Sequence, residues 1–194
     1  MLLQEKIKDI RVILASGSPR RQFLLGELGI DFQVRLSEVE EDFPAHLKRE
    51  EIPVFLAVKK SLAGAQNLAD DELLITADTI VWIDGRVLNK PANPEEALEM
   101  LRQLSGKMHE VISAVCLRNR RKSHTFYVVS EVIFRPLTEE EIRYYVNRFS
   151  PLDKAGAYGV QEWIGYIGVE AIRGSFYNVM GLPLSEVYSE MMAF

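Results

Sequence analysis

Residues 13–28 read ILASGSPRRQFLLGEL and contain a strand exit, a glycine turn and a helix start in direct succession. Ser18 is a favoured N-cap residue, and Pro19 suits the first helical position because its missing N–H would have no helical partner there. Three residues follow at a spacing that gives an apolar helix face: Leu24, Leu25 and Leu28. The stretch therefore predicts a strand and then a helix from Pro19 to near Gly29.

Two arginines, Arg20 and Arg21, fall in the first turn of this predicted helix. The unpaired N–H groups at a helix N-terminus already carry partial positive charge, so cations there are unfavourable unless an anion joins them. Ion pairs with surface carboxylates are the alternative, but the i+3 and i+4 neighbours are Phe and Leu. We expect an anion site, most plausibly for phosphate, built from the N-terminal amides, the guanidinium groups and the hydroxyls of Ser16 and Ser18.

The composition indicates an ordinary globular protein of 194 residues, 47% of them hydrophobic and 26% charged. The length of the chain fits one domain of generous size or two tightly joined lobes, and we expect residues 1–194 to form a single domain without a separable linker. The net charge of −5 argues against a nucleic-acid partner. Charges interrupt the N-terminal residues, so we expect neither a signal peptide nor a membrane span, and a cytoplasmic location. The single cysteine, Cys116, lies in an apolar run and predicts a core position.

Strand and helix patterns alternate along the chain. Strands are expected at 11–15, 31–36, 73–83, 86–88, 109–117 and 124–137, and helices at 53–67, 93–104, 138–148 and 184–192. Asp84-Gly85 predicts a primed hairpin turn. Asn93 and Glu96 predict a capping box. The segment 153–184 holds six of the twelve glycines and predicts short strands and loops close to a ligand.

Asp78 stands in the middle of the apolar strand pattern at 73–83. A buried carboxylate requires a partner or a metal. For phosphate chemistry the chain offers the candidate cations Arg20, Arg21, Lys60 and Lys90. The candidate carboxylates are Asp78 and one residue of the acidic segment 38–42, most plausibly Glu41. Hydrolysis of a phosphoanhydride needs phosphate charge to be neutralised, a water to be activated and usually Mg²⁺ or Mn²⁺ on carboxylate oxygens. Neither GxxxxGK[ST] nor GxGxxG occurs, which excludes the common glycine-rich phosphate loops.

The blocks SGSPRR, ADT, KP, LSGKMHEV, DKAGAYGVQ and GSFYNVMGLPL, taken in this order, resemble the Maf family of nucleoside triphosphate pyrophosphatases. The resemblance runs from about residue 12 to residue 188. It implies an α/β fold with a long curved mixed sheet flanked by helices, and two lobes around a deep cleft, similar to inosine triphosphate pyrophosphatases. The implied reaction converts a nucleoside triphosphate to monophosphate and pyrophosphate with a divalent cation, Mg²⁺ or Mn²⁺.

The resemblance also implies roles for individual residues. Asp78 would be the general base or a metal ligand, with Glu41 as its companion at the metal. The remaining residues would bind phosphate: Ser16, Ser18, Arg21, Lys60 and Lys90.

The branch of the family that acts on dTTP and UTP resembles this chain at three positions: Arg20, Thr79 and Gln161. We therefore expect dTTP and UTP as substrates, with modified pyrimidine nucleotides as further ones. A glutamine amide offers a donor and an acceptor, which suits the O4 and N3–H edge of a pyrimidine. The chain departs from the family pattern where Gly is usual, with Thr76, Asn89 and Glu162.

Two alternatives remain open at this point. An enzyme of the same fold could act on 7-methyl-GTP or other nucleoside triphosphates. A nucleotide- or nucleic-acid-binding regulator of septum formation is suggested by the family's association with that process and by the basic residues 118–122, which also fit a solvated hairpin tip. A homodimer is compatible with either alternative.

Overall fold

The computed structural model describes residues 1–36 and 39–194, and Glu38 of the predicted acidic segment therefore lies outside the described residues. Among the described residues, seven strands form one sheet in the order β2-β1-β3-β5-β6-β7, with β4 paired to β3. The strands are β1 (Arg11–Leu14), β2 (Phe32–Val34), β3 (Glu72–Ile83), β4 (Arg86–Leu88), β5 (Met108–Arg118), β6 (Ser123–Phe134) and β7 (Val169–Arg173).

The sheet is mixed, as the sequence predicts. Strand β1 runs parallel to both β2 and β3, whereas β3 pairs antiparallel with β4 and β6 pairs antiparallel with β7. The turn between β3 and β4 is the predicted Asp84-Gly85, with φ of 50° and 78°. Positive φ at both central residues is what a type I′ turn requires. The mixed α/β fold with flanking helices is thereby confirmed.

The helices are α1 (Leu3–Lys6), α2 (Pro19–Glu27), α3 (Glu51–Gly64), α4 (Pro94–Leu104), α5 (Glu139–Phe149), α6 (Trp163–Gly168), α7 (Phe176–Met180) and α8 (Leu184–Ala193), with 3₁₀ turns η1 (Ala65–Asn67) and η2 (Ala155–Ala157). The predicted caps hold for α2 and α4, where Ser18 and Asn93 accept bonds from helical N–H groups, and Thr138 caps α5 in the same way. No helix of the described part of the chain is both long and apolar enough to cross a membrane.

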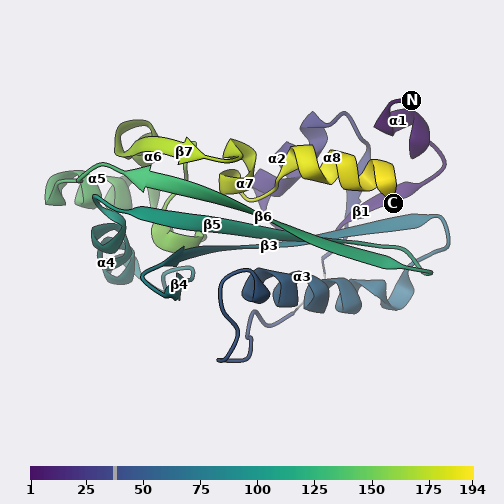
Figure 1. Cartoon of the computed structure of the whole chain (residues 1–194), viewed down its shortest axis with the longest axis horizontal. Coiled ribbons are helices and arrows are strands. Elements are labelled where there is room, and N and C mark those ends of the chain that lie inside the picture. The colour runs from purple at the N-terminus through teal and green to yellow at the C-terminus, as the bar shows by residue number, and fades with distance from the viewer. Residues whose placement is uncertain (37–38) are drawn as a thin grey trace. The chain divides into compact units, whose positions relative to one another are not determined.

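The chain divides into two compact units made from interleaved segments. Unit 1 contains residues 1–78, 113–128 and 181–194, and unit 2 contains residues 79–112 and 129–180. In unit 1, α3 covers one face of the strands while α2 and α8 lie on the other (Figure 1). Ala57 of α3 packs against Ala114 and Cys116 of β5, so the cysteine is a core residue, as expected.

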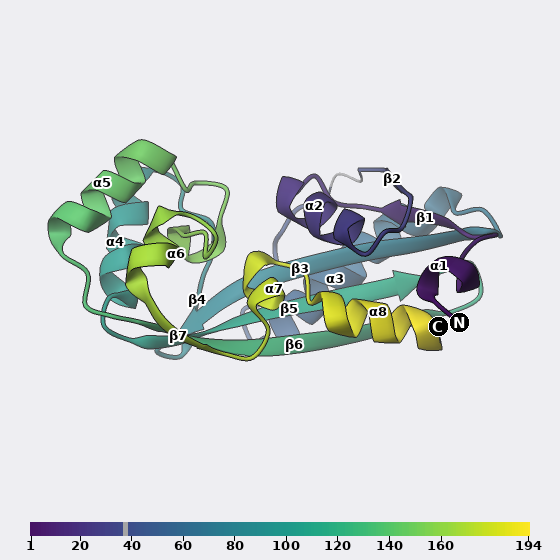
Figure 2. The same cartoon turned by 90° about the horizontal axis from the view of Figure 1, so that it is seen from above.

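Unit 2 has a large apolar core in which α4 packs against α5 and α5 against α6 (Figure 2). At its centre, the buried His109 lies between the rings of Phe134 and Tyr158, both in edge-on contact. Its Nε2 is 2.7 Å from the Tyr158 hydroxyl, and its Nδ1 has no hydrogen-bond partner within the described residues. Burial lowers the pKa of His109 to about 3, so the imidazole is neutral at physiological pH.

This buried histidine predicts a loss of stability in mild acid. The unfolded chain takes up a proton at His109 below pH ~6.5, whereas the folded chain resists until about pH 3. The contribution of the neutral His109 to the free energy of unfolding is therefore fully present above pH 6.5 and is lost progressively as the pH falls toward 3. At pH 5 the free energy of unfolding has fallen by about 2 kcal/mol. Urea unfolding at pH 7.5 and pH 5 should show a smaller difference in His109→Gln than in the wild type. An identical pH dependence in both proteins would contradict this expectation.

Three local predictions need correction. The segment 153–184, expected as short strands and loops, instead contains β7, the 3₁₀ turn η2 and two short helices, α6 and α7. The capping box at α4 is incomplete, because the Glu96 carboxylate accepts from the Ala92 N–H rather than from the cap residue. Strand β6 ends at Phe134 rather than at residue 137, and the Arg135 side chain instead donates to the Ile167 carbonyl and the Glu141 carboxylate.

The basic segment 118–122 forms the predicted hairpin tip, and three of its four cations contact this chain's own groups within unit 1. Arg118 donates to the Ser61 hydroxyl at 2.6 Å, and Arg120 pairs with Asp70 at 3.1 Å. The Lys122 ammonium donates to the carbonyl of residue 194 at 2.6 Å. These contacts explain the basic run structurally and weaken the case for a nucleic-acid-binding surface here.

Candidate functional site

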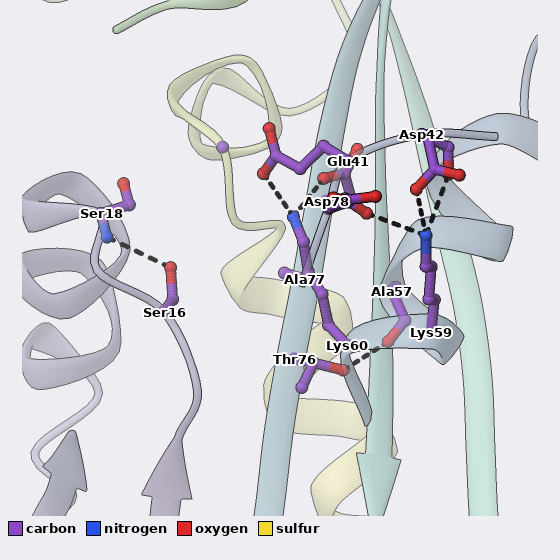
Figure 3. Close-up of polar contacts among 12 residues, drawn as sticks. Ser16, Ser18, Glu41, Asp42, Ala57, Lys59, Lys60, Thr76, Ala77 and Asp78 are labelled. Atoms are coloured by element: carbon purple, nitrogen blue, oxygen red, sulfur yellow. Dashed lines mark hydrogen bonds and ion pairs between the residues drawn. The ribbon is translucent and has the colours of Figure 1, made fainter. Parts of the chain in front are cut away.

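The turn between β1 and α2 is shaped by its two serines. The Ser18 N–H donates to the Ser16 hydroxyl at 3.3 Å (Figure 3). The Ser18 hydroxyl accepts from the Arg21 N–H at 3.4 Å. Ser16 is buried and Ser18 half-buried. The local sequence therefore produces the predicted helix N-terminus, with two hydroxyls next to its first amides.

Arg21 ties this helix to β3 and to the segment before α8, all within unit 1. Its Nε donates to the Gly181 carbonyl and one terminal nitrogen donates to the Ala77 carbonyl, both at 2.9 Å. Burial lowers the pKa of Arg21, while the attraction of Asp78 opposes that shift and the neighbouring Arg20 adds to it. The guanidinium is thus fixed beside the strand position that carries Asp78.

Asp78 is a buried carboxylate, 6% exposed, on a strand whose other residues are mostly apolar. Its Oδ1 lies 2.6 Å from the Lys60 ammonium, which projects from α3, and the same ammonium lies 2.8 Å from Oε1 of Glu41 (Figure 3). Burial raises the pKa of Asp78, against the opposing charges of Lys60 and Arg21. A carboxylate with a raised pKa is a stronger base than a solvated one.

Lys59 belongs to this cluster although it was not among the predicted site residues. Its ammonium donates to the Glu40 carbonyl at 3.0 Å and to both the carbonyl and the carboxylate of Asp42 (Figure 3). Lys59 therefore holds the residues on either side of Glu41, while Lys60 holds Glu41 itself. The sequence signal for this contact is a pair of adjacent lysines that follows a segment rich in carboxylates.

Thr76 occupies a position where the family pattern has a small residue. Its side chain is fully buried, and its hydroxyl donates to the Ala57 carbonyl of α3 at 2.8 Å (Figure 3). The polar group is therefore satisfied, and the bond joins α3 to β3 two residues before Asp78. This departure adds a link between the two elements that supply Lys60 and Asp78.

The other predicted site residues belong to unit 2. Thr79 follows Asp78 on β3 and is half-buried, and Lys90 is exposed between Asn89 and Pro91. Gln161 lies in the loop before α6, with its backbone carbonyl accepting a hydrogen bond from the Tyr166 hydroxyl. Its side-chain Oε1 is buried and has no hydrogen-bond partner among the described residues. A buried acceptor without a partner costs free energy and would gain a hydrogen bond if a ligand brought a donor to it.

Within unit 1, then, the structure brings together a buried carboxylate, a second carboxylate and two cations. No group of three or more His, Cys, Asp or Glu side chains with metal-binding geometry exists among residues 1–36 and 39–194. Carboxylate oxygens are nevertheless the ligands that Mg²⁺ and Mn²⁺ prefer, and Mg²⁺ is commonly held by one or two carboxylates together with substrate phosphates. The chemistry of Glu41 and Asp78 fits such an ion. An arrangement of cations and carboxylates of this kind is chemically suited to a phosphate-bearing substrate.

Comparison with known proteins identifies the family. The chain belongs to the Maf-like protein family, whose model matches residues 11–194. A protein of Parabacteroides distasonis named dTTP/UTP pyrophosphatase is 53% identical over 98% of this chain and 99% of its own length. Proteins of the same name from Bacteroides thetaiotaomicron and Flavobacterium johnsoniae are 55% and 46% identical, over 93% and 96% of this chain and 94% and 96% of their own lengths.

The solved structure of the Staphylococcus aureus Ham1 protein matches 64% of this chain and 71% of its own chain, with 15% identity and a TM-score of 0.45. The resemblance to inosine triphosphate pyrophosphatases stays a prediction, whereas membership of the Maf-like family is confirmed by the match over nearly the whole chain.

Proposed function

We propose that this protein is a nucleoside triphosphate pyrophosphatase that hydrolyses dTTP and UTP to the monophosphate and pyrophosphate. The observation that carries the proposal is the buried Asp78, held by Lys60 with Glu41 and Arg21 beside it. Burying a carboxylate costs free energy that an apolar residue at the same position would avoid, so a chemical role for Asp78 is favoured. Relatives that are about half identical over nearly the whole chain carry the corresponding name.

In the proposed reaction, a water attacks the α-phosphorus in line with the bond to the leaving group. The new P–O bond forms as the bridging bond to the β-phosphate breaks, and pyrophosphate leaves with that electron pair. Asp78 accepts the proton of the attacking water, which its raised pKa favours. The phosphate oxygens are bound by cations and by donors at the start of α2: Ser16, Ser18, Arg21, Lys60 and Lys90.

Lys60 connects the resting site to the bound state. In the structure its ammonium is shared by Glu41 and Asp78, so both carboxylates already have a counter-charge. Substrate phosphate brings further negative charge, and we expect Lys60 to turn toward it. Glu41 and Asp78 would then hold Mg²⁺ or Mn²⁺ together with phosphate oxygens. Bound there, the ion supplies charge neutralisation of the leaving pyrophosphate.

Gln161 is the residue proposed to recognise the base. The buried and unpartnered Oε1 of Gln161 can accept the N3–H of thymine or uracil, and its amide can donate to O4. Arg20 and Thr79 are the further selectivity residues that the family resemblance implies. The nearest alternative is an enzyme of the same fold that prefers a nucleotide with another base, such as 7-methyl-GTP. The contacts of residues 118–122 disfavour the nucleic-acid-binding alternative.

Hydrolysis in ¹⁸O-labelled water tests the reaction type. Attack at the α-phosphorus should place the label in dTMP and leave the pyrophosphate unlabelled, as read by mass spectrometry of both products. Label in the pyrophosphate would show attack at the β-phosphorus. Release of dTDP and inorganic phosphate would show a phosphatase instead of a pyrophosphatase, and either result would contradict the proposed mechanism.

A further inference from the structure

The loop that carries Gln161 is anchored on both sides of this residue. Tyr145, fully buried on α5, accepts a hydrogen bond from the Gly159 N–H at 3.0 Å through its hydroxyl oxygen. The same hydroxyl donates to Oε2 of Glu162. One phenol oxygen therefore binds the backbone two residues before Gln161 and the side chain directly after it.

Glu162 is held a second time by a cation. Its Oε1 lies 3.1 Å from the ammonium of Lys154, which is itself buried and also pairs with Asp153 at 2.7 Å. Both oxygens of the Glu162 carboxylate thus have a partner, one neutral donor and one charged donor. A carboxylate satisfied in this way has one preferred position, because moving it breaks both contacts.

The backbone closes around the same carboxylate. The Glu162 N–H donates to the Gly159 carbonyl at 3.0 Å, and the Gly165 N–H donates to the Glu162 carbonyl at 2.9 Å. A Cβ atom on Gly159 would lie 2.7 Å from Cδ of Glu162. The loop is therefore folded tightly over the Glu162 side chain. This side chain occupies the space that a side chain at Gly159 would need.

Gln161 lies within this loop, with its backbone carbonyl hydrogen-bonded and one side-chain oxygen without a hydrogen-bond partner among the described residues. Its carbonyl accepts from the Tyr166 hydroxyl, whereas its buried Oε1 has no hydrogen-bond partner within the described residues. Leaving a buried acceptor unsatisfied costs free energy, so it is maintained only where the surroundings fix the side chain. A glycine at position 162 would have no side chain with which to make these contacts.

We propose that Glu162, held by Tyr145 and Lys154, is a positioning residue that fixes Gln161 to select pyrimidines with a carbonyl at C4 and a proton on N3. The inference rests on the proposed function, since it assigns the selectivity of that same site. Glu162 contacts neither the base nor the phosphates. It acts through the loop, and Tyr145 and Lys154 act through Glu162.

The selectivity between dTTP and dCTP reports the inferred role, because cytosine reverses the donor and acceptor at these two ring positions. Glu162→Gln keeps the size of the side chain but loses the ion pair with Lys154, and Glu162→Gly installs the residue usual in the family. Tyr145→Phe removes the hydroxyl from the other end of the network. Glu170→Gln, at an exposed position on β7 in the same unit, is the matched control.

We expect kcat/KM for dTTP relative to dCTP to fall about tenfold in Glu162→Gln and Glu162→Gly, mainly through a higher KM for dTTP. Both variants should keep kcat within about threefold of the wild type, because the reacting groups are untouched. Glu170→Gln should match the wild type in every measurement. An unchanged ratio in folded Glu162→Gln and Glu162→Gly, or a fall in kcat at constant KM, would overturn the inference.

Hydrogen exchange of the amides in residues 159–165 separates the two possible failures. Exchange should be faster in Glu162→Gln and Tyr145→Phe than in the wild type, and unchanged in Glu170→Gln. Wild-type exchange in these variants would show that the network does not fix the loop and would overturn the inference while dTTP hydrolysis stands. A wild-type enzyme that hydrolyses neither dTTP nor UTP would instead overturn the proposed function, and with it the base assigned to Gln161.

Discussion

Replacing Asp78 with asparagine is expected to lower kcat for dTTP by about 10²–10⁴-fold while the protein stays folded. Asparagine has nearly the same volume, so the packing of β3 is kept. It cannot take a proton from water, and it no longer offers a charge to the Lys60 ammonium now 2.6 Å away. Because Lys60 retains Glu41 as a partner at 2.8 Å, no buried charge is left alone.

The matched control is Asp84→Asn. Asp84 lies in the exposed turn at the end of the same strand and pairs with Lys107, and asparagine tolerates its positive φ. This variant should keep wild-type turnover. Titration with Mn²⁺ then separates two roles of Asp78, because a metal ligand predicts weaker ion binding in Asp78→Asn and a pure base predicts unchanged binding. Full turnover by Asp78→Asn would exclude both roles.

Replacing Gly165 with alanine is expected to cost about 3 kcal/mol or more of stability and to remove activity. A Cβ atom at this position would lie 1.9 Å from the Val160 carbonyl oxygen and 2.5 Å from its carbon. Both are backbone atoms, so no side-chain rotation relieves the overlap. Either α6 or the loop that carries Gln161 must move, and the core of unit 2 opens with it.

Gly26→Ala in α2 is the control for this substitution. A Cβ atom there meets only a ring carbon of Phe32 at 3.9 Å, an ordinary contact, and alanine is the better helix former. Its stability should stay within about 1 kcal/mol of the wild type or rise. Thermal unfolding of the purified variants measures both effects, and a Gly165→Ala protein as stable as the wild type would contradict the geometry of this loop.

Local signals predicted most of the fold. Ser18 and Pro19 fixed the start of α2, Asp84-Gly85 fixed the hairpin, and Asn93 fixed the start of α4, because each of these residues acts on backbone groups within a few positions. The segment 153–184 was predicted less well. Its aromatic residues and glycines obscure helical spacing, and α6 and α7 are short helices whose stability depends on tertiary packing rather than on propensity.

The candidate site was predictable only in part. An aspartate in an apolar strand signals a buried charge from sequence alone, but its partner depends on how α3 lies against β3, which no local pattern specifies. The residue pattern offered Lys60 and Glu41 among several candidates, and the family resemblance assigned them to one site. It could not supply Lys59, which acts on the residues flanking Glu41, or Glu162, whose contacts with Tyr145 and Lys154 join three separate elements.

Pyrophosphate release from a panel of dTTP, UTP, dCTP and 7-methyl-GTP, each with Mg²⁺ and with Mn²⁺, tests the central claim most directly. The proposed function predicts the highest kcat/KM for dTTP and UTP, about 100-fold or more above 7-methyl-GTP, because the larger, positively charged 7-methylguanine carries its carbonyl and ring N–H farther from the sugar than a pyrimidine does. Preference for 7-methyl-GTP, or no pyrophosphate from dTTP and UTP with either ion, would contradict it.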